Sequence, residues 1–178
     1  MLKMGSSLLA VVLVGTLAGC STSTKSADVS NQIRASLDQA GFKDVSASQD
    51  RDKGVVTLGG HVATEGDKSQ AESIAKSIAG AQVLSNQIAV IPPGVEREAK
   101  KVNSDLDKGI KSNLDAALIK GRLHESVKYA VENHVVTLTG EVDSQSKRVR
   151  AGEVASAVLN VEQVVNELQV KGQKASSN

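Results

Sequence analysis

Cys20 is the only cysteine in the 178-residue chain, and its thiol is the most reactive side chain that the sequence offers. A thiolate can act as a nucleophile or bind a metal, and a cysteine can also carry a lipid. A lone cysteine has no partner within the chain for a disulfide. Lys3 and the short apolar run at residues 8–16 precede it. They are typical of a secretory signal, because a membrane-spanning helix needs about 20 apolar residues.

The string Leu17-Ala18-Gly19-Cys20 resembles the lipobox of bacterial lipoproteins. The resemblance implies cleavage after Gly19, a lipid on the sulfur of Cys20 and acylation of the new amino terminus. Several acyl chains give stable anchoring to a membrane, whereas one chain is marginal. Ser21, by analogy with lipoprotein sorting in enteric bacteria, favours the periplasmic face of the outer membrane. The alternative is an ordinary secretory signal followed by an incidental cysteine.

Two groups of basic residues in the second half of the chain could bind anionic ligands. The first group is Lys108 and Lys111 beside Leu114 and Leu118 on an expected helix, and the second is Lys147, Arg148 and Arg150 at the start of another. An apolar stripe beside lysines can dock on an anionic bilayer, where each basic residue contributes roughly 1 kcal/mol. Cations at a helix start also oppose the helix dipole, which favours a functional reason for the second group. The alternative is that the two leucines pack on a sheet and the lysines are only solvated.

Other kinds of chemistry have little support in the sequence. The histidines His61, His124 and His134 show no metal-ligand spacing, and no phosphate-binding glycine loop or serine nucleophile motif is present. Charge is balanced, with 21 basic and 20 acidic residues, and the only aromatic side chains are Phe42 and Tyr129. Single-stranded nucleic acids need a basic groove and aromatic stacking platforms. We therefore expect no enzyme activity, no cofactor, no metal site and no nucleic-acid partner.

The chain contains a repeat. Residues 54–90 align without a gap with residues 134–170, and ten residues are identical. The identical residues of the first copy are Val55, Val56, Thr57, Leu58, Gly60, Val62, Ala71, Ala75, Asn86 and Val90. In the second copy they recur, in the same order, as Val135, Val136, Thr137, Leu138, Gly140, Val142, Ala151, Ala155, Asn166 and Val170. Apolar periodicities predict helix, strand, strand, helix, strand in each copy. This order indicates an α+β protein of two tandem αββαβ domains, each a three-stranded sheet with two helices on one face.

Turn and cap residues also recur. The expected hairpin turns are residues 51–54 and 132–133, the helix stops are Gly41 and Gly121, and the N-caps are Thr64 and Ser144. Gly60 and Gly140 indicate a bulge or a close backbone approach. Asn86 and Asn166 fall on an apolar strand face, where we expect them to satisfy backbone groups at a strand end.

These signals divide the chain into six segments. They are a signal peptide at 1–19, a flexible lipidated tether at 20–28, a first domain at 29–91, a linker at 92–103, a second domain at 104–171 and a disordered tail at 172–178. Pro92 and Pro93 break the chain, and the apolar spacing after them predicts one long helix over residues 95–119.

The two copies resemble the BON domain, named for bacterial osmotically induced and nodulation proteins. The strand motif reads Val-Val-Thr-Leu-x-Gly at 55–60 and 135–140, and each copy ends on an Asn-x-φ-x-Val motif at 86–90 and 166–170. The resemblance implies a non-enzymatic role in cell-envelope integrity and osmotic stress, with anionic phospholipid bound by the second copy. A periplasmic module that binds envelope proteins, or acts as a chaperone without lipid affinity, is the alternative.

Overall fold

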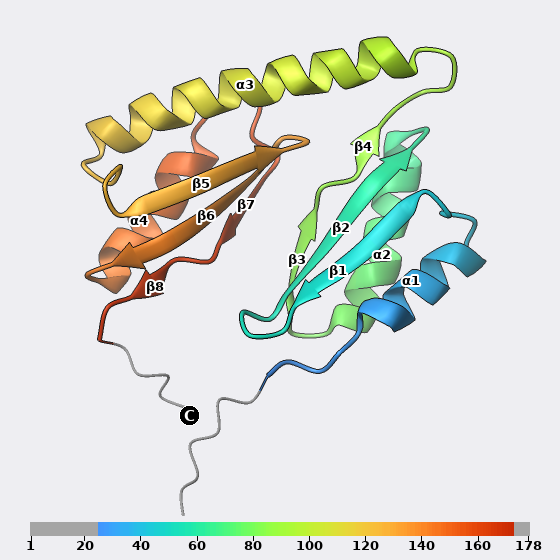
Figure 1. Ribbon diagram of the computed structural model, residues 1–178, viewed down its shortest axis with the longest axis horizontal. Helices are drawn as coiled ribbons and strands as arrows, with labels where there is room; N and C mark the ends of the chain where they lie inside the picture. The colour runs from blue at the N-terminus through green and yellow to red at the C-terminus, as the bar shows by residue number, and fades with distance from the viewer. Residues whose placement is uncertain (1–24, 173–178) are drawn as a thin grey trace, which may run out of the picture.

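The computed structural model describes residues 25–172 of the chain (Figure 1). The first domain consists of α1 (Ser30–Gln39), β1 (Val45–Asp50), β2 (Val55–Val62), α2 (Glu65–Ala79), β3 (Val83–Asn86) and β4 (Ala89–Val90). The second consists of α3 (Glu96–Lys120), β5 (Val127–Glu132), β6 (Val135–Val142), α4 (Gln145–Ser156), β7 (Gln163–Asn166) and β8 (Gln169–Val170). The structure thus confirms the expected α+β class and the repeated order of elements.

Each sheet has a central strand with antiparallel and parallel neighbours. In the first domain β1 pairs antiparallel with β2, whereas β3 and β4 both pair parallel with β2. β5, β6, β7 and β8 repeat this arrangement. The third strand predicted for each sheet is therefore present, but it is broken into two short pieces.

An asparagine side chain occupies each break. The Asn86 Oδ1 accepts a hydrogen bond from the backbone N–H of Ile88 at 3.3 Å, so the chain turns locally instead of continuing the ladder. Its amide also donates to Glu72 of α2 at 2.9 Å. Asn166 repeats the turn with Leu168 N–H at 3.2 Å and donates to the carbonyl of Arg148 in α4 at 2.8 Å. The expectation that these asparagines satisfy backbone groups is confirmed, and they also attach the break to the helix.

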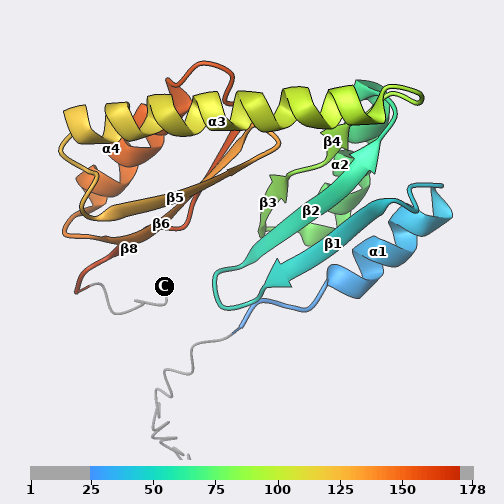
Figure 2. The same ribbon diagram turned by 45° about the horizontal axis from the view of Figure 1, so that its top comes forward.

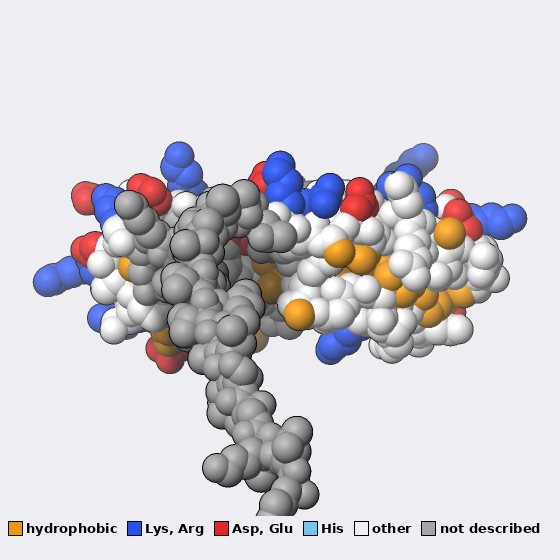
Figure 3. All heavy atoms as spheres, turned by 90° about the horizontal axis from the view of Figure 1, so that it is seen from below, with side chains coloured by type: hydrophobic (Ala, Val, Ile, Leu, Met, Phe, Trp, Pro, Cys, Tyr) orange, Lys and Arg blue, Asp and Glu red, His pale blue; other side chains and the backbone are white. Residues whose placement is uncertain are grey.

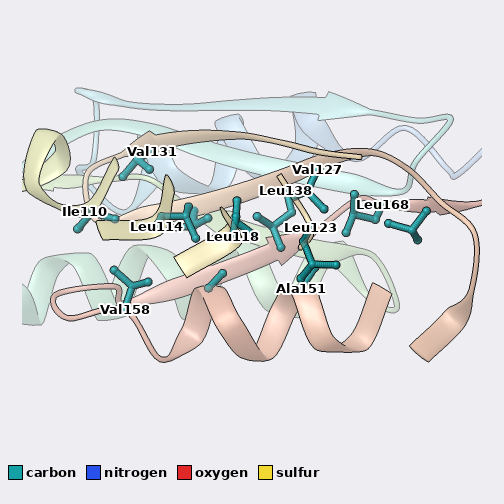
Figure 4. Close-up of a cluster of buried hydrophobic side chains, with 13 residues drawn as sticks. Ile110, Leu114, Leu118, Leu123, Val127, Val131, Leu138, Ala151, Val158 and Leu168 are labelled. Carbon is teal, nitrogen blue, oxygen red and sulfur yellow. The ribbon is translucent and has the colours of Figure 1, made fainter. Parts of the chain in front are cut away.

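Both helices of each domain pack on the same face of its sheet, as the sequence predicts. Figure 4 shows the aliphatic core of the second domain, in which α3 and α4 side chains meet those of β5 and β6. The first domain has an equivalent core around Ile33 and Leu37 of α1. Since aromatic residues are nearly absent, Val, Leu, Ile and Ala supply this buried surface at about 25 cal/mol per Å² of apolar area.

Two glycines let the hairpin strands approach closely. Gly60 has a φ of +93°, and a Cβ built on it would lie 2.0 Å from the carbonyl oxygen of Asp44. Gly140 has a φ of +119°, and its Cβ would lie 2.5 Å from the oxygen of Ser126. The predicted close backbone approach is confirmed at both positions.

The helix starts and the helix stops were predicted correctly, whereas one turn was not. The side chains of Thr64 and Ser144 accept hydrogen bonds from backbone N–H groups in the first turns of α2 and α4. The second hairpin turn consists of Asn133 and His134, both with positive φ, rather than of residues 132–133. α3 ends at Lys120 with Gly121 as its C-cap, as predicted, and the left-handed residue is Arg122, one position later.

The two domains contact each other through the sheet faces that carry no helices and through the edge of β3. Val55 and Val135, which are equivalent in the repeat, form a buried cluster with Val165. The side chain of Gln163 donates to the carbonyl of Leu84 at 2.7 Å and accepts from Asn86 N–H at 2.9 Å. A long side chain therefore fills the place of a further strand at this edge.

The segment expected to be a flexible tether is ordered where the structure describes it. Ser26 N–H donates to the carbonyl of Arg51 at 2.9 Å, and the Arg51 Nε donates back to the carbonyl of Ser26 at 2.8 Å. Gln49 donates to Ala27 O at 2.7 Å and accepts from Val29 N–H at 3.0 Å. Residues 25–28 are thus held against the β1–β2 hairpin. The expected signal peptide, Cys20, the rest of the tether and residues 173–178 lie outside the described residues.

Candidate functional site

A hollow lined by three lysines lies along α3, which crosses one side of the molecule (Figure 2). We call it the α3 groove, and it encloses about 300 Å³ between α3, the end of β4 and the β5–β6 turn. It is lined by Ala89, Ile91, Lys100, Asn103, Ser104, Asp107, Lys108, Lys111, Glu132 and Asn133. The groove brings together two of the basic residues singled out from the sequence, Lys108 and Lys111, and adds a third, Lys100.

The charges of the groove are only partly compensated. Lys108 lies 3.0 Å from Asp105, which also binds Lys101 at 2.6 Å. Hydrogen bonds from Lys101 and Lys108 lower the pKa of Asp105 below its ordinary value. Among residues 25–172, neither Lys100 nor Lys111 forms an ion pair. Two lysine charges of the groove therefore remain available to an anion.

Two acidic residues, Asp107 and Glu132, line the groove, and Asp107 already has hydrogen-bond partners. The carboxylate of Asp107 accepts from Asn133 N–H at 3.0 Å and from His134 N–H at 2.9 Å. These two bonds fix α3 to the β5–β6 turn, whose residues have left-handed backbone conformations. Asp107 thus positions the helix against the turn, and its charge is offset by two backbone donors.

The basic residues at the start of α4 do not form one surface. Lys147 pairs with Asp143 at 2.7 Å and Arg150 is exposed, without an ion pair in the described part of the chain. Arg148 turns inward instead, and its Nη2 donates to the carbonyl of Asn166 at 3.2 Å. Its Nε is buried without a hydrogen-bond partner among the described residues. Arg148 lines a second hollow, between the domains, with Lys53 and Glu167.

Leu114 and Leu118 cannot belong to a lipid-binding surface of the folded domain. Both side chains have 0% exposure and lie in the core of the second domain (Figure 4). The expectation that they contact phospholipid was wrong, because their spacing marks the face of α3 that packs on the sheet. The apolar stripe and the lysines lie on different faces of the helix, so no amphipathic docking face of that kind exists.

Lys100 was missed as a candidate residue, although a signal for it was present. Lys100, Ser104, Lys108 and Lys111 follow a spacing of four, four and three residues, which places them along one helix face. The long helix over 95–119 had been predicted, but its first half had been assigned to a linker. The groove partners on β4 and on the β5–β6 turn carry no such signal, since they depend on how the domains pack.

Within residues 25–172, no helix combines the length and the hydropathy needed to cross a bilayer.

A second ionic cluster links the domains near the groove. Glu162 of the second domain lies 2.8 Å from Lys68 of the first and 3.0 Å from the Nδ1 of His134. Partial burial opposes the charge of Glu162, but the hydrogen bonds from Lys68 and His134 outweigh it and lower the pKa of this carboxyl group.

Comparison with known proteins gives three matches of interest. The family pattern of the BON domain matches residues 25–92 and again residues 104–172. Osmotically-inducible protein Y of Escherichia coli (strain K12) is 31% identical over 149 residues, which are 80% of this chain and 71% of the relative. A solved structure of CdsD, a structural protein of the type III secretion system of Chlamydia trachomatis, has a TM-score of 0.36 at 13% identity. That alignment covers 81% of this chain and 92% of the CdsD chain.

Proposed function

The chain belongs to the BON-domain family, and from this premise we propose that it is a lipid-anchored protein of the cell envelope that binds anionic phospholipid. The lipid on Cys20 holds it at the periplasmic face of the outer membrane. Exposed cations of the second domain contact the lipid headgroups. Through these contacts the protein supports the integrity of the envelope under osmotic stress. The name of the E. coli relative, an osmotically inducible protein, supports the link to osmotic stress.

The observation that carries the lipid-binding proposal is the uncompensated charge on the second domain. Lys100 and Lys111 in the α3 groove and Arg150 on α4 form no ion pair among the described residues. Each basic residue that comes near an anionic bilayer contributes about 1 kcal/mol, and exposed ion pairs such as that of Lys108 are weak enough to be exchanged for a phosphate. Several such residues together give measurable binding without any buried apolar anchor.

The test uses the chain from residue 21 to residue 178, which lacks Cys20, and vesicles of two compositions. The protein should sediment with phosphatidylglycerol-rich vesicles and not with phosphatidylcholine vesicles. Binding should weaken as the salt concentration rises from about 0.05 to 0.2 M, because the contacts are exposed ion pairs that salt screens. Equal binding to both vesicle types, or no binding to either, would rule out recognition of the anionic headgroup.

The first half of α3 and Val95, the residue just before it, favour a second candidate function, binding of an envelope protein. Val102 is 56% exposed and Val95 is 44% exposed, so apolar surface remains uncovered there. A partner crosslinked through Val102→Cys, in a protein that shows no lipid selectivity in the sedimentation test, would support this candidate in place of the first.

A further inference from the structure

The point at which the N-terminal segment reaches the first domain limits the orientations that the anchored protein can take on its membrane. Residues 25–28 lie along the β1–β2 hairpin, where Ser26 and Arg51 exchange two hydrogen bonds. Ala27 accepts hydrogen bonds from Gln49 at 2.7 Å and from Gln82 at 3.2 Å. Lys25 adds an ion pair with Asp52 at 3.2 Å. The anchored chain is therefore attached at the hairpin and not at the start of α1.

The chain between the lipid and this attachment is short. Six residue steps separate Cys20 from Ser26, and an extended chain covers at most about 3.6 Å per residue. The Cα atom of Ser26 therefore stays within about 22 Å of the Cα atom of Cys20, whose sulfur carries the lipid. The hairpin end of the molecule must remain close to the anchoring membrane as long as these hydrogen bonds hold.

The α3 groove lies at the opposite end. β2 runs from the hairpin at Val55 to Val62, and its last residues pair with β4, which leads into the groove. Eight strand residues span about 25 Å, and a helix adds about 10 Å more. In Figures 1 and 2, α3 lies across the side of the molecule away from the start of the described chain. The chain from Cys20 is too short for the protein to stand with α3 on the membrane and the hairpin end pointing away from it.

The hairpin end also includes cations of the second domain. Arg148 and Gln169 line one hollow together with Asp52 and Lys53 of the hairpin, so β8 and the start of α4 lie at this end. Lys147 and Lys171 lie near a single carboxylate, that of Asp143. The hydrogen bond from Lys147 is the main reason why the pKa of this carboxyl group is lowered. In the space-filling view from this side, Lys and Arg side chains stand out around the rim (Figure 3).

We propose that the anchored protein stands on its membrane with the hairpin end down, so that Lys147 and Lys171 meet the headgroups and α3 faces away. The proposal rests on the lipid anchor of the proposed function and decides which of its cations touch the anchoring bilayer. The lysines of the α3 groove remain exposed on the far side. In the anchored protein they therefore take no part in the contact with the anchoring bilayer, whereas the soluble chain can use them to bind vesicles.

The test is made on the full-length lipidated protein in phosphatidylglycerol-containing vesicles. Since lipidation blocks Cys20, Gln169→Cys and Val102→Cys each introduce a single free thiol, at exposed positions on β8 and α3. A fluorophore on residue 169 should be quenched at least about threefold more by a headgroup-attached quencher than one on residue 102. Equal quenching, or stronger quenching at residue 102, would overturn the proposed orientation, and so would a protein that carries no lipid on Cys20.

A second variant tests the cause of the orientation. Gln49→Ala removes hydrogen bonds to Ala27 and Val29 and should reduce the difference between the two labels. A difference that persists unchanged would contradict the role given to the ordered segment. Failure of the soluble chain to select anionic vesicles would refute headgroup recognition but leave the quenching difference in place, so the two proposals fail separately.

Discussion

The side chain of Gln163 accepts a hydrogen bond from the backbone N–H of Asn86 at 2.9 Å, across the boundary between the two domains. The same amide donates to the carbonyl of Leu84 at 2.7 Å. One side chain thus satisfies two backbone groups on the free edge of β3. In the repeat, the residue equivalent to Gln163 is Val83, which is 49% exposed and could not make these bonds. The contact therefore belongs to one copy only.

Replacement of Gln163 by valine, the residue of the other copy, should weaken the docking of the domains. The change leaves Leu84 O and Asn86 N–H without their partner, at a cost of about 1–3 kcal/mol. Urea unfolding should show lower stability, and the amide of Asn86 should exchange faster with solvent. Gln169→Val, on the exposed part of β8, is the matched control and should leave that amide protected. Unchanged exchange at Asn86 in Gln163→Val would refute the bond.

Alanine at Gly60 should be far more costly than alanine at another glycine of the chain. The new Cβ would lie 2.0 Å from the carbonyl oxygen of Asp44, at a φ of +93°. We expect a loss of about 1–3 kcal/mol in the free energy of unfolding. Gly109 lies inside α3 with nothing within 4 Å of its Cβ position, so Gly109→Ala should stabilise the protein by up to about 1 kcal/mol. Equal effects of the two substitutions in thermal unfolding would contradict the close approach.

The ionic cluster between the domains should make stability depend on acid pH. The folded protein lowers the pKa of Glu162 below its ordinary value of 4.5, so this carboxylate contributes stability above pH 4.5. That contribution is lost as the pH falls through the lowered pKa. The difference in melting temperature between the wild type and Glu162→Gln should therefore be largest near neutral pH and shrink in acid.

The partner of Glu162 provides the control for this prediction. In a Lys68→Met background the effect of Glu162→Gln should be smaller, because the two side chains interact at 2.8 Å. Strictly additive effects of the two substitutions at neutral pH would show that the pair contributes no coupling.

Lipidation of Cys20 can be tested in whole cells. The wild-type chain should incorporate a labelled fatty acid and partition into the detergent phase, whereas Cys20→Ser should do neither. A Cys20→Ser protein that keeps the label would place the lipid elsewhere, and a wild type without label would remove the anchor.

Much of the fold could be predicted because the repeat shows each signal twice. The N-caps Thr64 and Ser144 and the glycines Gly60 and Gly140 depend on local backbone geometry, which residue type reveals directly. The turn at residues 133–134 was misplaced because neither residue is the glycine that usually marks such a turn, and two N–H bonds to Asp107 hold this turn in place.

The candidate site was harder to predict than the fold. Periodicity detects that Leu114 and Leu118 share a face, but it does not say whether a sheet or a lipid covers that face. The structure answers this for both residues, since they are fully buried. The α3 groove depends on how the two domains dock. Docking residues such as Gln163 are polar and occur in one copy only, so neither apolar periodicity nor the repeat reveals them in the sequence.

The most direct measurement is vesicle sedimentation of charge-reversal pairs in the chain from residue 21 to residue 178. Lys108→Glu with Lys111→Glu, and Lys147→Glu with Arg150→Glu, should each weaken binding to phosphatidylglycerol-rich vesicles. The two pairs combined should weaken it by at least about 30-fold, because whichever end of the molecule meets the bilayer then lacks two cations at about 1 kcal/mol each. Lys43→Glu with Lys76→Glu makes the same change in net charge on exposed residues of the first domain and should have a much smaller effect. If this control pair weakened binding as much as the other two, the second domain would not be the lipid-binding part of the protein.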